Sequence, residues 1–176
     1  LILIVPNIIL CFTEPMPVVA KVCNLLLPFA FYYLLMTLSR NCGKMFWILF
    51  LFIFFGAFQI VLLYLFGQSI IAVDMFLNLV TTNSSEAMEL LDNLVPALVS
   101  VIILYIPALI LAAISIIKKR KLSPEFIRRE RKKAWIALLI GFISLGAAYG
   151  LDKRYELKSD LYPANVCYNV ALAFQR

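Results

Sequence analysis

Long apolar stretches, separated by short segments rich in proline or charge, recur along most of the chain. A membrane-spanning helix needs about 20 consecutive apolar residues. Four stretches approach or exceed this length, at 18–38, 45–66, 94–117 and 134–151. A further apolar run extends from Leu1 to Phe12, and we expect it to be the remainder of a first helix that has lost its beginning. The pattern therefore predicts an all-α membrane protein with five transmembrane helices in residues 1–151.

The predicted connections differ in length and in charge. Pro15 and Pro17 mark a tight turn after the first helix, because two prolines so close together cannot continue a helix. Residues 118–133 carry nine basic side chains and are predicted to form a loop. Residues 152–176 are predicted to form a polar tail or a bridging helix, in which Pro163 begins a short helical segment.

A few residues inside the predicted helices are unusual for a lipid environment. Asn24 and Gln59 are polar, and hydrogen bonds between helices would satisfy them. Gly146 and Gly150 are four residues apart, a spacing that allows close helix packing in lipid. Pro28 lies inside the second helix and predicts a kink.

The distribution of basic residues predicts the orientation. Arg40, Lys44 and the basic residues of 118–133 lie on one side of the predicted membrane. A smaller set lies on the other side: Lys21, Lys153, Arg154, Lys158 and Arg176. The side richer in Lys and Arg is usually cytoplasmic. In a bacterial inner membrane, 118–133 is then a cytoplasmic loop, and segment 68–93 and the C-terminus are periplasmic.

Composition excludes several classes of protein and site. Hydrophobic residues make up 64% of the chain and the mean hydropathy is +0.96, which argues against a soluble domain. Histidine is absent and the four cysteines form no CxxC pair, so a Cys/His zinc site and a Cys–His nucleophile are excluded. The basic loop suits topology and anionic lipid better than nucleic acid. The chain has no internal repeat of the kind found in many transporters.

The long segment between the third and fourth helices carries the candidate chemistry. Polar residues recur there every three or four positions: Asp74, Asn78, Thr82, Glu86, Glu89 and Asn93. This spacing predicts an amphipathic helix at the membrane surface. No Lys or Arg occurs between Lys44 and Lys118, so the segment presents unpaired carboxylates that would attract an ammonium group. Alternatively, Asn83 and Glu86 form only a capping box, and the neighbouring polar residues are merely solvated.

The stretch from Asn78 to Glu86, with its neighbours, resembles a segment of the phosphoethanolamine transferases that modify lipid A, a family that includes the transferable colistin-resistance enzymes. Members have five membrane helices, a bridging helix and a periplasmic domain of the alkaline phosphatase/sulfatase type. They carry Asn-x-x-x-Thr-x-x-x-Glu between helices 3 and 4, which Asn78, Thr82 and Glu86 match. The resemblance is sharp over about residues 74–91, and 160–165 also resembles the family's passage toward the soluble domain.

The resemblance implies a two-step transfer from phosphatidylethanolamine to lipid A. A threonine of the soluble domain, activated by zinc, attacks the donor phosphate, and the phosphoethanolamine then passes to a lipid A phosphate. The residues matching Asn78, Thr82 and Glu86 are implied to bind the donor headgroup, with Glu86 paired to its ammonium. The zinc ligands and the nucleophile belong to the soluble domain. We therefore assign no catalytic residue, no metal ligand and no cofactor to this chain, and expect it to be inactive alone.

Two other functions remain open at this stage. A related transferase could move phosphoglycerol, although an acidic surface suits a donor that bears an ammonium group. A non-enzymatic lipid-binding scaffold or transporter subunit is the alternative from another class. Transport pathways usually place ionisable groups within the spans, and the third, fourth and fifth predicted helices have none between their ends.

Overall fold

The protein is all-helical over the part of the chain that the structure describes. The computed structural model describes residues 1–13, 15–66 and 84–175, without the side chains of 59, 62–66, 84–94, 158–159, 169–170 and 173–175. These parts contain no strand. Their elements are the 3-10 turn η1 (Ile2–Ile4), α1 (Val5–Thr13), α2 (Val18–Met36), α3 (Cys42–Ile48), α4 (Phe50–Phe66), α6 (Ser84–Ile117), α7 (Pro124–Leu151), α8 (Leu157–Asp160) and α9 (Ala164–Gln175).

Three stretches of helix are long and apolar enough to cross a membrane: Val18–Met36, Val95–Ile117 and Pro124–Leu151. The last two expose large aliphatic side chains along their length, such as Ile103, Leu111 and Leu139. Exposed apolar surface on this scale is typical of a lipid-facing protein. The prediction of an all-α fold is thus confirmed over the described residues, and the three candidate spans are consistent with a membrane protein. α1, with 9 residues, and α4, with 17, are shorter than the usual span.

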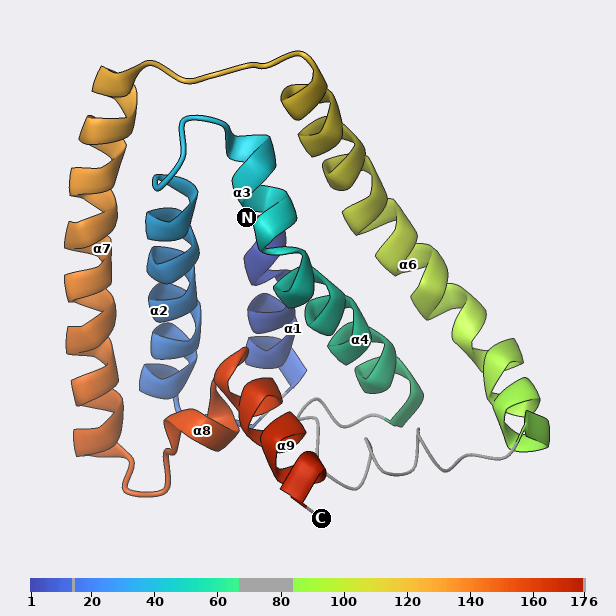
Figure 1. The fold of residues 1–176 in the computed structure, drawn as a ribbon. Coiled ribbons are helices and arrows are strands. Elements are labelled where there is room, and N and C mark those ends of the chain that lie inside the picture. Colours follow the sequence, from blue (N-terminus) through green and yellow to red (C-terminus); the bar gives the residue numbers. More distant parts are fainter. Residues whose placement is uncertain (14, 67–83, 176) are drawn as a thin grey trace.

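The helices lie side by side with α7 and α6 on opposite flanks (Figure 1). α7 packs against α2, α2 contacts α1, and α6 packs against α3 and α4. The bundle of helices therefore has two ends, at each of which several helices begin or end. We call one the basic end, where α2, α6 and the loops before α3 and α7 meet (top of Figure 1). The other, which holds α8, α9 and the first turns of α2 and α6, we call the tail end.

Two hydrogen bonds join the two basic segments, one between backbone groups and one from a side chain to the backbone. The Leu122 N–H donates to the Arg40 carbonyl at 2.9 Å, and the Arg40 side chain donates through Nε to the Leu122 carbonyl at 3.0 Å. The segments around Arg40 and 118–123 therefore lie together at one end of the bundle, as the distribution of basic residues over the connections predicts. Lys21, in the first turn of α2, and Arg154, after the last turn of α7, lie at the opposite end (Figure 1).

The N-terminus of α7 differs from the sequence expectation. The fifth helix was expected to begin at 134 after a loop over 118–133, but α7 begins at Pro124. The Ser123 hydroxyl caps it by accepting from the Phe126 N–H at 3.2 Å, and proline occupies the first helical position. Serine followed by proline is a strong helix start. The loop thus ends at Ser123, and five of the basic residues belong to the helix.

Two other helices also begin earlier than expected. α6 starts at Ser84 rather than at 94 and continues through Pro96 and Pro107, and α2 likewise continues through Pro28. The start at Ser84 agrees with the capping-box alternative, although Asn83 itself lies outside the described residues. α3 begins at Cys42 because the Asn41 side chain accepts from the Lys44 N–H at 3.1 Å. The third predicted helix is also interrupted at Leu49.

The closest backbone approaches occur at two glycines that the four-residue spacing did not indicate. A Cβ at Gly43 would lie 2.3 Å from the Ala112 carbonyl oxygen, where α3 crosses α6. A Cβ at Gly141 would lie 3.1 Å from the Leu27 Cα, where α7 crosses α2. No described atom lies within 4 Å of a Cβ at Gly146 or Gly150. Among the described residues, the packing role predicted for the Gly146–Gly150 pair therefore belongs to Gly43 and Gly141.

Replacing Gly43 with alanine should force α3 and α6 apart. Overpacking a close contact typically costs about 1–3 kcal/mol, and here the clash is with backbone rather than with a side chain that can rotate away. The unfolding free energy of purified protein in detergent should fall by that amount. The matched control is Gly146→Ala, which removes a helical glycine in open space and should be neutral or stabilising by about 0.5–1 kcal/mol. Equal effects of both variants would contradict the packing role.

Candidate functional site

The residues that the sequence singled out are only partly described. Asn78 and Thr82 lie outside the described residues. Glu86 lies in the first turn of α6, but its side chain is outside the described part. The structure therefore leaves the predicted grouping of these three side chains as a prediction. It does place Phe66 and Ser84, between which the undescribed segment runs, at the tail end (Figure 1).

The tail end is built by the docking of residues 155–166 onto the membrane helices. Asn7 on α1 donates through Nδ2 to the Tyr162 carbonyl at 2.8 Å. Asn24 on α2 donates to the Asp160 carbonyl, also at 2.8 Å. Both amides are fully buried. Two side chains from the first helices thus hold backbone groups that lie more than a hundred residues later in the chain.

Tyr155 and Tyr162 complete the docking from the other side. The Tyr155 hydroxyl donates to the Asn24 Oδ1 at 2.9 Å, so both polar atoms of that amide are engaged. The Tyr162 hydroxyl donates to the Phe52 carbonyl of α4 at 2.8 Å. It approaches α4 beside Gly56, where a Cβ would lie 2.9 Å from the hydroxyl oxygen. The tail is therefore tied to α1, α2 and α4 at once.

Both tyrosines act as neutral donors. Burial raises the pKa of Tyr155 above its ordinary value, and a nearby Cys23 thiol adds to the shift. Burial likewise raises the pKa of Tyr162. Removing a phenol from water disfavours its charged form. The two hydroxyls therefore keep their protons over the whole physiological pH range, and neither is suited to act as a base.

Apolar contacts accompany these bonds. Tyr162 and Val166 pack with Leu10 of α1, while Tyr155 and Leu161 pack with Ala20 and other small residues of α2 and α7. The contacts and the hydrogen bonds involve the same short segment. The Asn24 amide has both of its polar atoms paired and so avoids the desolvation penalty of an unpaired amide, whereas the buried Asn7 Oδ1 and Asn165 Nδ2 have no partner among the described residues.

Two cavities border the docked segment. One, of about 500 Å³, has a polar rim that includes Asp152, Arg154 and Asp160. The other, of about 280 Å³, is apolar and lies among Leu27, Phe142 and Leu161. The two cavities share no lining residue, so the docked segment borders two separate surfaces, one with charged side chains and one apolar. Over the described parts of the chain, no group of three or more His, Cys, Asp or Glu side chains is arranged to hold a metal ion.

Comparison with known proteins gives no match to this chain, whether with family models, with curated proteins or with solved structures. The resemblance to the phosphoethanolamine transferases therefore rests on the residues of the chain themselves, chiefly those at 74–91.

Sequence reasoning missed most of the docking residues. It expected Asn24 to bond between membrane helices, whereas this amide binds the tail through Asp160 and Tyr155. It did not single out Asn7, Tyr155 or Tyr162. One available signal was a lone asparagine in each of two apolar helices. The expectation that a short helix begins at Pro163 is confirmed, since α9 starts at the next residue.

Replacing Tyr155 with phenylalanine should loosen the tail. The Asn24 Oδ1 would lose its donor while remaining buried, which costs about 1–3 kcal/mol. We expect faster hydrogen exchange and faster proteolysis of residues 152–166 in detergent-solubilised protein. The matched control is Tyr32→Phe, because the buried Tyr32 hydroxyl has no hydrogen-bond partner among the described residues. Equal protection of the tail in both variants would contradict the role of Tyr155.

Proposed function

We propose that this chain is the membrane and donor-lipid-binding part of a phosphoethanolamine transferase, which moves phosphoethanolamine from phosphatidylethanolamine to lipid A. The observation that carries the proposal is the convergence at the tail end. The docked segment 155–166 lies at the same end at which α6 begins at Ser84. In the family, the passage toward the catalytic domain and the Asn–Thr–Glu segment must face the same compartment. The arrangement of this chain supports that requirement.

The proposal includes a five-crossing topology. α1 and the α3–α4 pair would complete the crossings made by α2, α6 and α7, with the basic end in the cytoplasm. The tail end, segment 68–93 and the C-terminus would then be periplasmic. The pairing of the segment around Arg40 with 118–123 supports this assignment, because it gathers most of the basic residues at one end.

Glu86 is the residue on which donor recognition rests. A carboxylate in a segment without basic neighbours would pair with the ethanolamine ammonium, and Asn78 and Thr82 would hydrogen-bond around the phosphate. The start of α6 at Ser84 puts Glu86 in a first helical turn. We assign no catalytic residue and no zinc ligand to this chain. The threonine nucleophile and the zinc would belong to a soluble domain of the same enzyme.

The polar and apolar cavities at the tail end give further support. A donor lipid needs an apolar surface for its chains and a polar region for its headgroup, and both kinds of cavity border the docked segment. A non-enzymatic lipid-binding scaffold would share these cavities but would not depend on Glu86 for any transfer.

Replacing Glu86 with glutamine in the enzyme that carries both domains should lower the transfer of phosphoethanolamine at least about tenfold, since a charge-assisted bond to the ammonium is lost. Membrane insertion should be unchanged. Transfer is measured from labelled phosphatidylethanolamine to lipid A. Asp92→Asn is the matched control, because it removes one carboxylate outside the predicted polar row. Wild-type transfer by the Glu86 variant would contradict the ammonium-binding role.

The chain on its own should transfer no phosphoethanolamine and should bind no zinc tightly. Both properties follow from assigning the nucleophile and the metal ligands to another domain. Metal analysis of purified protein after dialysis against a weak chelator tests the second point. Zinc retained at one equivalent per chain would contradict the assignment.

A further inference from the structure

The basic end contains a pocket that the proposed transfer does not use. It has a volume of about 420 Å³ and lies where α6 ends and α3 begins. Its lining consists of Arg40, Cys42, Ser115, Arg120, Lys121 and Leu122. Pockets that hold small ligands span roughly 300–1,000 Å³, so this one is large enough for a lipid headgroup.

The local fold fixes the cations around this pocket. α6 ends in a turn in which the Arg120 N–H donates to the Ser115 carbonyl and the Lys119 N–H donates to the Ile116 carbonyl, both at 3.0 Å. Lys119 has a φ of 50°, the left-handed conformation that closes such a helix end. The paired hydrogen bonds between Arg40 and Leu122 hold the opposite wall. Arg40, Arg120 and Lys121 therefore line one pocket from two loops that these hydrogen bonds hold together.

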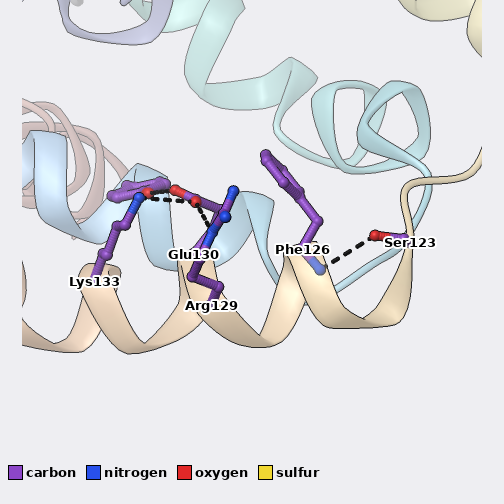
Figure 2. A network of polar contacts seen from close by, with 6 residues as sticks. Ser123, Phe126, Arg129, Glu130 and Lys133 are labelled. Atoms are coloured by element: carbon purple, nitrogen blue, oxygen red, sulfur yellow. Dashed lines mark hydrogen bonds and ion pairs between the residues drawn. The ribbon is translucent and has the colours of Figure 1, made fainter.

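The positive charge of the pocket is not neutralised by a neighbouring carboxylate. In the described parts of the chain, none of Arg40, Arg120 and Lys121 makes an ion pair. The carboxylate of Glu130, on the first half of α7, is already occupied. It accepts from Lys133 Nζ at 2.9 Å and from Arg129 Nε at 3.2 Å (Figure 2), and from the Tyr33 hydroxyl. The pocket thus carries three cations with the capacity to bind an anion.

The level of the pocket relative to the apolar spans indicates which class of anion it would bind. Arg40 follows the last residue of the α2 span, Met36, by four positions, and Arg120 follows Ile117 of α6 by three. At this distance beyond the apolar stretch, side chains lie at the level of the lipid headgroups. Ile117 itself is 77% exposed, directly before the turn. An anion at this level has apolar surface beside it for attached chains.

We propose that this pocket is a binding site for the phosphate of an anionic phospholipid, held by Arg40, Arg120 and Lys121. The three cations bind the phosphate oxygens, and the acyl chains lie along the exposed face of α6. Such a lipid would brace the loop after α6 against the loop before α3. Basic pockets at the ends of membrane helices are a common way to recognise anionic headgroups. The inference does not depend on the proposed transferase function.

The experiment measures lipid retention by the purified full chain. The protein is equilibrated with an equimolar mixture of phosphatidylglycerol and phosphatidylcholine, and bound lipids are counted by native mass spectrometry. We expect one phosphatidylglycerol to be retained, at least about tenfold in preference to phosphatidylcholine. Arg120→Gln should weaken this binding about fivefold, and Arg40→Gln with Arg120→Gln more than about tenfold. Arg120→Lys, which keeps the charge, should retain most of it.

The matched control is Arg128→Gln, which removes one exposed charge at the same end but outside the pocket. It should leave retention within about twofold of the unaltered protein, because diffuse surface charge contributes little to one specific site. Equal retention of the two lipids would overturn the proposal. So would an Arg128→Gln effect as large as that of Arg120→Gln. Binding of millimolar inorganic phosphate without any binding of phosphatidylglycerol would overturn the lipid assignment in favour of free phosphate.

Discussion

The Asn24 amide on α2 holds the C-terminal segment to the membrane helices, and the arrangement of the tail end depends on it. Its nitrogen donates to the Asp160 carbonyl and its oxygen accepts from Tyr155, so one fully buried side chain makes two bonds across the docking surface. Helix association in lipid gains little from the hydrophobic effect, because the surrounding chains are as apolar as the side chains. Close packing and hydrogen bonds must supply the specificity. On α1, Asn7 makes one such bond, through its nitrogen to the Tyr162 carbonyl.

The two ends of the bundle use polar groups differently. The tail end buries neutral amides and phenols and pairs most of them internally, leaving the Asn7 Oδ1 and the Asn165 Nδ2 without a partner among the described residues. The basic end instead keeps several cations exposed, and its two loops are joined through backbone groups and Arg40. This division is consistent with a protein that docks a further structure at one end and meets anionic lipid at the other. The two ends follow from the order of the helices along the chain, since every second connection returns to the same end.

The positions of the long helices could be predicted from the apolar stretches, because a single stretch in lipid can form all of its backbone hydrogen bonds internally only as a helix. The ends of the helices were less predictable where a run of charged residues indicated a loop but the capping residues indicated a helix. The basic residues after 118 suggested a loop, yet Ser123 and Pro124 begin α7 among them. Capping is a local backbone effect and does not require apolar neighbours. The docking partners of Asn7 and Asn24 could not be predicted, because a pattern of residues does not say which distant carbonyl an amide will meet. The row formed by Asn78, Thr82 and Glu86 remains a sequence-based expectation.

The bond between Asn7 and Tyr162 spans 155 positions of the chain. During synthesis from the N-terminus, α1 leaves the ribosome long before its partner exists. The Asn7 amide is then without this partner until Tyr162 has been made. Contacts between residues this far apart in the sequence form late, since the intervening chain must close into a loop first. Docking of the 155–166 segment onto α1 thus comes late in the assembly of the described part of the chain.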